Sequence, residues 1–124
     1  MMKKPVVLVV EDDERSARLM HDVLEHEGLE VLVTDSGELA LTLTRLHHPA
    51  FVLMDIHLPG ISGFDALREI RADASIAHTP VVAVTAAVVG NPQQLYASAG
   101  FDAFQPKPII LREFLGTIRK LIAA

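Results

Sequence analysis

The chain has no cysteine and no tryptophan among its 124 residues, and only 5% of them are aromatic. Without cysteine, structural disulfides and thiolate metal sites are excluded. No apolar run approaches the roughly 20 residues that a membrane-spanning helix needs. Acidic residues outnumber lysine and arginine by 16 to 11, and this net negative charge argues against a general nucleic-acid-binding surface. We therefore expect a cytoplasmic protein that binds neither membranes nor nucleic acids.

Half of the residues are apolar, in a chain that has the length of one domain. We expect residues 1–124 to form a single domain with no further output domain. Short apolar runs, rich in β-branched residues, alternate with segments of helical periodicity. The expected strands cover residues 6–10, 30–34, 50–54, 81–85 and 102–105.

Each expected strand is followed by an expected helix with its own start signal. Asp13 or Glu14, Ser36 and Ser62 are typical N-cap residues, and Asn91-Pro92 starts the fourth helix. We expect the larger apolar side chains of the helices to face the sheet. These are Leu19, Met20, Val23 and Leu24; Leu39, Leu43 and Leu46; Phe64, Leu67 and Ile70; Leu95 and Tyr96; and Ile110, Phe114, Leu115, Ile118 and Leu121.

Strict alternation of five strands and five helices predicts an α/β fold. Right-handed crossovers give a parallel sheet with helices on both faces. For five strands, the order 2-1-3-4-5 of flavodoxin-like folds is the leading choice, and its ligand site lies where strands one and three diverge.

Polar side chains follow the strands at the edge where such a site would lie. Glu11 and Asp12 follow the first strand, Asp55 the third, Thr85 ends the fourth and Lys107 follows the fifth. Clustered carboxylates repel one another, and oxygen ligands favour Mg²⁺ or Mn²⁺. With a hydroxyl and an ammonium facing the same anion, the set suits phosphoryl transfer, in which a carboxylate can be the covalent acceptor.

Four fragments at these strand ends resemble one known family. They are Val-Val-Glu11-Asp12-Asp13, Met-Asp55-Ile-His57-Leu-Pro59-Gly60, Val-Thr85-Ala86 and Lys107-Pro108. In their order and spacing they are similar to the response-regulator receiver domain of two-component signalling, over essentially the whole chain. The resemblance implies a receiver fold and a cytoplasmic phosphoprotein that forms an aspartyl phosphate.

The resemblance also implies a role for each matching residue in the metal site. Asp55 would accept the phosphoryl group and ligate Mg²⁺ together with Asp12. Glu11 would ligate through water, and His57 through its backbone carbonyl. Glu11 departs from the family pattern, in which aspartate is commoner at this position, and His57 stands at a position that varies within the family.

Other roles implied by the resemblance concern the phosphoryl group and the response to it. Thr85 and Lys107 would bind phosphate oxygens, and the small Ala86 would leave access to the acyl phosphate. Phe104 matches the aromatic switch position. The peptide bond between Lys107 and Pro108 would be cis, which only X–Pro bonds adopt at low cost.

As a function, the resemblance implies a phosphorelay receiver rather than a turnover enzyme. It would catalyse its own phosphorylation and dephosphorylation and would signal through protein contacts, as a monomer or weak homodimer. A histidine kinase or phosphotransfer protein would meet the first helix near residues 15–19, and a downstream target would meet the fourth and fifth helices with the fifth strand.

Three alternatives stay open at this point. A metal-dependent phosphatase with an aspartyl intermediate usually needs a second aspartate where His57 stands. A flavodoxin-like cofactor binder needs a phosphate loop rich in small residues in place of residues 11–14. A receiver-like binding module that is never phosphorylated would not need the set of Asp55, Thr85 and Lys107.

Overall fold

The computed structural model describes residues 4–86 and 92–123. Over these residues, five strands alternate with five helices, as the sequence predicts. The strands are β1 (Val6–Val10), β2 (Glu30–Thr34), β3 (Phe51–Asp55), β4 (Val81–Thr85) and β5 (Ala103–Pro106). The helices are α1 (Glu14–His26), α2 (Gly37–His47), α3 (Gly63–Ala72), α4 (Pro92–Ala99) and α5 (Leu111–Ala123). Asn91, expected to start the fourth helix, lies outside the described residues.

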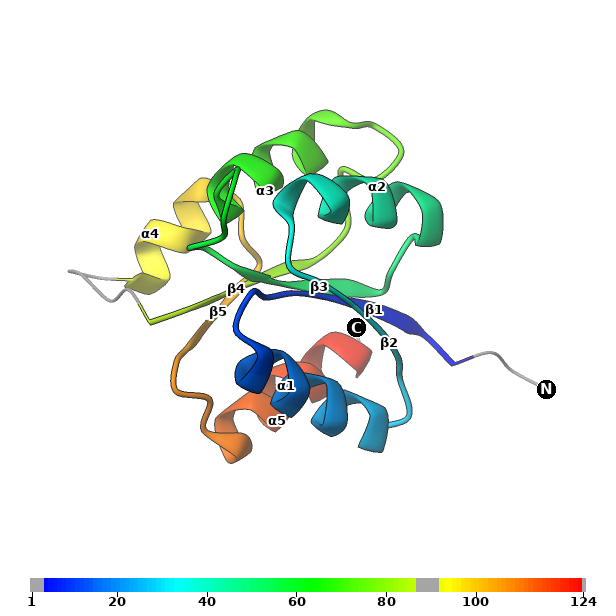
Figure 1. The fold of residues 1–124 in the computed structure, drawn as a ribbon, viewed down its shortest axis with the longest axis vertical. Coiled ribbons are helices and arrows are strands. Elements are labelled where there is room, and N and C mark those ends of the chain that lie inside the picture. Colours follow the sequence, from blue (N-terminus) through cyan, green and yellow to red (C-terminus); the bar gives the residue numbers. More distant parts are fainter. Residues whose placement is uncertain (1–3, 87–91, 124) are drawn as a thin grey trace.

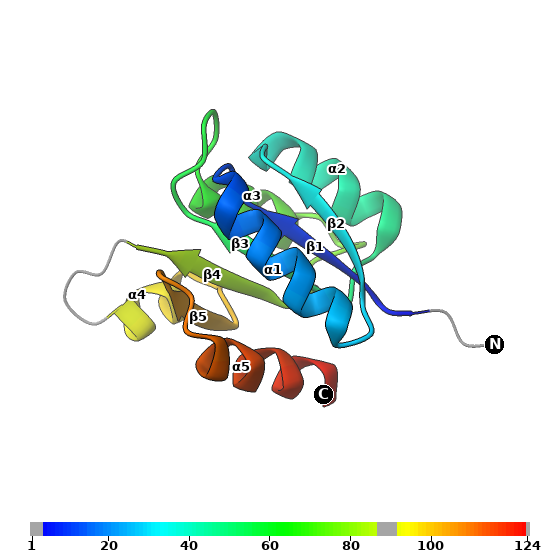
Figure 2. The same ribbon diagram turned by 60° about the horizontal axis from the view of Figure 1, so that its bottom comes forward.

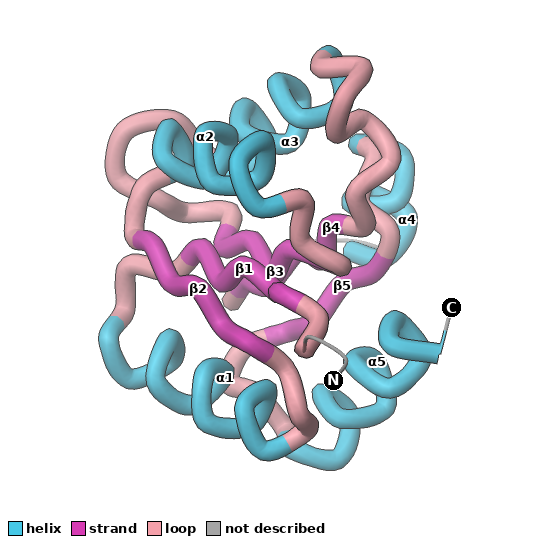
Figure 3. The backbone as a smooth tube through the Cα atoms, turned by 90° about the vertical axis from the view of Figure 1, so that its right-hand side faces the viewer, coloured by secondary structure: helices cyan, strands magenta, loops and turns pink. Residues whose placement is uncertain are grey.

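The strands form one parallel sheet in the order β2-β1-β3-β4-β5, which confirms the predicted topology. Helices α2, α3 and α4 cover one face, and α1 and α5 cover the other (Figures 1 and 3). Figure 2 shows α1 and α5 together on the near side of the sheet. Every residue of β3 and β4 is buried, as expected for strands covered on both faces.

Three of the helices begin at the predicted N-caps. The side chain of Asp13 accepts a hydrogen bond from the backbone N–H of Ser16 at 3.1 Å. The Ser36 hydroxyl accepts a hydrogen bond from the backbone N–H of Leu39 at 3.1 Å, and the Ser62 hydroxyl accepts one from that of Asp65 at 3.2 Å. Each cap satisfies a backbone donor that the first turn of a helix leaves free, and so fixes where the helix starts.

The predicted inward face of α2 is wrong for Leu39 and Leu46, whereas Leu43 is half-buried and packs against the core. Leu39 and Leu46 are 52% and 70% exposed, whereas Gly37, Ala40 and Thr44 are buried. The small residues let α2 lie close to its neighbours, since a Cβ on Gly37 would come within 2.8 Å of Ile61 Cγ1. Leu19 of α1, Leu95 of α4, and Ile110 just before α5 are likewise more than 40% exposed instead of buried. The buried positions of α3 and α5 include Leu67, Ile70, Phe114 and Ile118, as predicted.

Among the helices in the described part of the chain, none combines the length and the apolar character required to cross a membrane.

Candidate functional site

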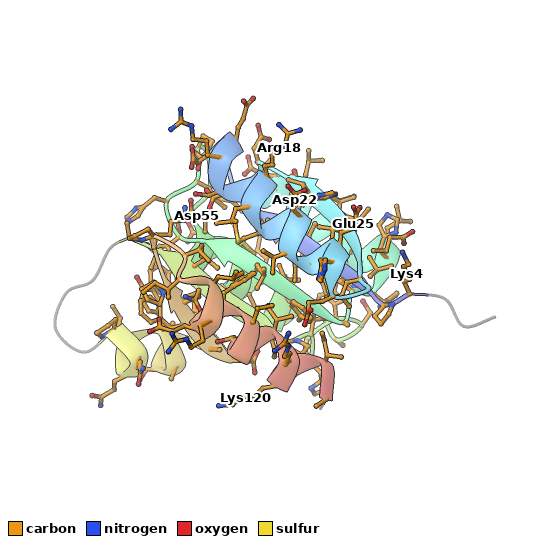
Figure 4. All side chains as sticks on the ribbon, turned by 90° about the horizontal axis from the view of Figure 1, so that it is seen from below. Lys4, Arg18, Asp22, Glu25, Asp55 and Lys120 are labelled. Atoms are coloured by element: carbon orange, nitrogen blue, oxygen red, sulfur yellow. The ribbon has the colours of Figure 1, made fainter. Side chains whose placement is uncertain are left out.

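The carboxyl ends of β1 and β3 bring the predicted acidic residues together. Asp55 is the last residue of β3, and Glu11 directly follows β1. The register pairs Val10 with Met54, so the next residue on each strand, Glu11 and Asp55, continues side by side on the same face. In Figure 4, Asp55 lies at the end of the sheet opposite Lys4, which precedes β1.

Lys107 contacts both buried carboxylates at this edge. Its Nζ donates a hydrogen bond to Asp55 Oδ2 at 3.2 Å and lies 2.5 Å from Glu11 Oε1. The backbone N–H of His57 donates to the other Asp55 oxygen, Oδ1, at 3.2 Å. The Asp55 side chain is only 7% exposed and that of Glu11 is fully buried, so little water screens these charges.

The edge that carries Glu11, Asp12 and Asp55, called the acidic edge from here on, presents the oxygen ligands that a hard metal ion prefers. Within residues 4–86 and 92–123, one group of acidic or histidine side chains could hold a metal, namely Glu11, Asp12 and Asp55, whose oxygens lie within 4.8 Å of one another. Glu11 Oε1 is buried, and its partner is the Lys107 ammonium at 2.5 Å. A set of clustered carboxylate oxygens, without nitrogen or sulfur ligands, fits Mg²⁺.

The charges at this edge shift two pKa values. Burial, and then the adjacent Asp55, raise the pKa of Glu11 to about 7, because together they outweigh the opposite effect of Lys107. Burial lowers the pKa of Lys107, but the Glu11 and Asp55 carboxylates outweigh it and hold that pKa above its usual value. The ammonium therefore stays charged near neutral pH, while Glu11 is only partly ionised without a metal.

We expect the metal-free protein to lose stability as the pH rises from about 4.5 to about 7. An unfolded chain ionises Glu11 at its ordinary pKa of 4.5, whereas the folded protein keeps this proton up to about 7. In that window the folded state binds one proton more, so the free energy of unfolding falls with rising pH. The full shift is equivalent to on the order of 3 kcal/mol.

Urea unfolding in EDTA across this pH range measures the effect, with Glu11→Gln as the matched control. The variant has no carboxyl group to titrate, so its stability should fall less than that of the wild type between about pH 5 and pH 8. Parallel curves for the two proteins would contradict the assignment. Added Mg²⁺ should restore wild-type stability at the upper pH by binding only the folded state.

The remaining residues expected in the site lie around this edge. Thr85 ends β4 and is fully buried, and Ala86 beyond it is exposed. The Lys107–Pro108 peptide bond is cis, as expected, and Pro108 is exposed. The backbone N–H of Lys107 donates to the Thr85 carbonyl at 3.0 Å, which ties the end of β5 to the end of β4.

Phe104 lies on the other face of the sheet from the carboxylates. It packs into the core under α3 and α4 together with Ala83, its register partner on β4. Because side chains alternate along a strand, Thr85 points to the same face as Ala83. Phe104 and Thr85 are therefore diagonal neighbours on adjacent strands.

The start of α3 packs directly on the backbone that carries Asp55. The N–H of Gly63 donates to the carbonyl of Ile56 at 2.9 Å. A Cβ at position 63 would overlap the carbonyl oxygen of Asp55 and lie 2.9 Å from Ile56 Cα. Glycine is therefore the residue that this contact requires.

Two features of the site have no signal in the sequence. One is the close contact of Lys107 with Glu11, which is shorter than its contact with Asp55. The other is Tyr96, which stacks on Phe104 with ring centroids 5.0 Å apart. Both depend on how side chains from distant elements meet, and strand-end reasoning does not supply that.

Comparisons with known proteins agree with the fold. Residues 7–119 match the family model of the response regulator receiver domain, so the chain belongs to that family, which acts in two-component systems. It is similar to the polar-differentiation response regulator DivK of Brucella ovis, with 38% identity over 116 residues and 94% of both chains covered.

Solved receiver domains have the same fold. The non-phosphorylated HemR receiver domain of Leptospira biflexa superposes with a TM-score of 0.86 and 29% identity, covering 98% of this chain and 96% of the other. The receiver domain of a Pseudomonas aeruginosa sensor histidine kinase, which has a magnesium ion in its active-site cleft, gives 0.88 and 25%, covering 98% and 100%.

Proposed function

We propose that this receiver domain works in a phosphorelay by accepting a phosphoryl group on Asp55. The observation that carries the proposal is the position of the Asp55 carboxylate. It is nearly buried, hydrogen-bonded to Lys107, and beside the carboxylates of Glu11 and Asp12. A carboxylate held between an ammonium and a candidate metal site is placed to attack a phosphoryl group whose charge both cations would neutralise.

The transfer itself is a displacement at phosphorus. A carboxylate oxygen of Asp55 attacks the phosphorus of a phosphohistidine, the P–N bond breaks, and the imidazole leaves with the bond's electron pair. Hydrolysis later removes the phosphoryl group. Water attacks phosphorus, the bond between phosphorus and the Asp55 oxygen breaks, and inorganic phosphate departs while Asp55 becomes a free carboxylate again. The small, exposed Ala86 leaves room for the donor and for this water.

Asp12 and Asp55 would hold Mg²⁺ directly, Glu11 through water, and His57 through its backbone carbonyl. When bound, the ion supplies charge neutralisation for the phosphoryl oxygens. Lys107 would pair with one phosphate oxygen and Thr85 would donate to another, on the side of Asp55 away from Asp12. Among the described residues, Thr85 is the hydroxyl at the end of β4 and Lys107 is the cation that follows β5.

Protein partners would use two separate surfaces. The donor, a histidine kinase or phosphotransfer protein, would meet the first turns of α1, where Arg15, Arg18 and Leu19 are exposed beside the acidic edge. A downstream target would meet α4, β5 and α5, since Phe104 is half-buried at the surface between α4 and β5.

Intact-mass measurement tests the proposal. Incubation with Mg²⁺ and acetyl phosphate should add about 80 Da to the wild type, the mass of one phosphoryl group. Asp55→Asn should give no adduct, because an amide is a poor nucleophile at this position. An adduct that persists in Asp55→Asn, or its absence from the wild type, would overturn the proposal and favour a binding module that is not phosphorylated.

A further inference from the structure

Three aromatic rings form a continuous stack under the helices α3 and α4. Tyr96 of α4 stacks on Phe104 of β5 with centroids 5.0 Å apart and planes 10° from parallel. Its other face stacks on Phe64 of α3, at 5.5 Å and 12°. Phe101 meets both Phe64 and Tyr96 edge-on, at 5.8 Å. Tyr96 is thus the middle ring of the stack, and stacked and edge-on pairs are both favourable arrangements.

Tyr96 is also what attaches α4 to the core. All eight residues of α4 are described, and Tyr96, 3% exposed, is the buried one among them. Its neighbour Leu95 is 52% exposed. A helix with a single buried side chain depends on that side chain for its position, because tertiary packing supplies most of the stability of a short helix.

Phe104 connects this stack to the phosphorylation site. It pairs in register with Ala83, two residues before Thr85, on the face to which Thr85 also points. In the proposed function, Thr85 binds a phosphoryl oxygen. Because Phe104 matches the aromatic switch position of the family, we expect its ring to turn towards the space that Thr85 leaves. Staggered rotamers of a phenylalanine side chain place its ring several ångströms apart. A parallel stack at 5.0 Å does not survive such a turn.

We propose that Tyr96 is a positioning residue of the switch, whose stack on Phe104 holds that ring in its unphosphorylated orientation and whose loss on phosphorylation frees α4. The proposal rests on phosphorylation of Asp55. It assigns to Tyr96 a bias of roughly two- to tenfold between the two orientations of Phe104, the contribution of one aromatic pair. Removing the ring then raises the population of the phosphorylated-like state before any phosphate arrives.

The protein carries its own probe for this change. Tyr96 is the only tyrosine and the chain lacks tryptophan, so tyrosine emission comes from this one ring. We expect phosphorylation by acetyl phosphate with Mg²⁺ to increase the quenching of this emission by acrylamide, because α4 loses its attachment. Intact mass is measured on the same sample. Leu95→Ala, on the exposed side of the same helix, should behave as the wild type does.

The outcomes separate this inference from the function on which it rests. An adduct without a change in quenching overturns the role of Tyr96 and leaves phosphorylation of Asp55 intact. Absence of the adduct overturns both. An adduct with increased quenching supports both.

A second measurement asks whether Tyr96 sets the equilibrium or only fills space. Beryllium fluoride mimics the phosphoryl group, and its binding with Mg²⁺ can be followed by fluorine NMR without tyrosine. Tyr96→Leu should bind it roughly two- to tenfold more tightly, since less of the binding energy is spent on turning Phe104. Tyr96→Phe keeps the stacked ring and loses only the hydroxyl, so its affinity should stay closer to that of the wild type than the affinity of Tyr96→Leu does. Equal or weaker binding by Tyr96→Leu contradicts the proposal, because loss of packing alone does not strengthen binding.

Discussion

Replacing Lys107 by methionine is expected to lower the free energy of unfolding of the metal-free protein by about 3 kcal/mol near pH 8. Lys107 Nζ is the cation that contacts Glu11 and Asp55 in the structure, and its side chain is only 16% exposed. Methionine retains most of the apolar stem and removes the charge. Two adjacent buried carboxylates then repel each other with little water to screen them, so the cost is that of an uncompensated buried charge.

The same substitution elsewhere on the chain provides the control. Lys120 is exposed in the last turn of α5, and Lys120→Met should change stability by less than about 0.5 kcal/mol. Urea unfolding in EDTA gives both values. Added Mg²⁺ should return much of the stability of Lys107→Met, because it supplies the missing positive charge. If the two variants lose equal amounts, the ion pair at the acidic edge contributes nothing measurable to folding.

The second large effect concerns Arg71, which joins three segments far from the acidic edge. Its Nε and Nη2 donate to the Gly100 carbonyl at 3.3 and 3.0 Å. Nη1 donates to the carbonyls of Ala77 and Thr79 at 3.0 and 2.6 Å, and Nη2 also donates to Asp102 at 2.9 Å. The guanidinium therefore holds the end of α3, the loop before β4 and the turn that follows α4.

We expect Arg71→Ala to cost about 3 kcal/mol, because three backbone carbonyls lose their side-chain donor in a partly buried place. Arg71→Lys keeps the charge but not the fork of donors, so it should lose most of the same stability. Arg68→Ala is the control on the same helix, since this side chain is 79% exposed and forms an exposed ion pair with Asp65 at 3.6 Å.

Urea unfolding of the three variants gives the comparison, and hydrogen exchange locates the loss. The amide of Asp102, which donates to the Val81 carbonyl at 2.8 Å, should exchange faster in Arg71→Ala than in Arg68→Ala. If Arg71→Lys were as stable as the wild type, charge rather than the fork geometry would account for the contact.

The sequence was sufficient to predict the fold and the meeting of the acidic residues. Runs at 6–10 and 81–84 are apolar throughout because both faces of the sheet are covered, and alternation with helices leaves few topologies. Parallel strands end at one edge, which places Glu11 beside Asp55 whatever the details of helix packing. These inferences need only the order of the elements.

The orientation of α2 could not be predicted in this way. Two sets of its residues recur at helical spacing, one with Leu39 and Leu46 and one with Ala40 and Thr44. Hydrophobicity favours the leucines, but the close approach of α2 to Ile61 needs the small residues. The stack of Tyr96 on Phe104 was out of reach for a similar reason, because it depends on rotamers and on the placement of α4.

Gly63 fixes the distance between the start of α3 and the backbone of Asp55, because it has no side chain. Its missing side chain lets α3 rest on the peptide of Asp55, so α3 and the end of β3 share one backbone contact. Evolution or engineering can vary the exposed residues of α1, α4 and α5, where we propose that partners bind, without touching that contact. Position 63 itself offers no such freedom, and a library that randomises it should return glycine wherever Asp55 must keep its place.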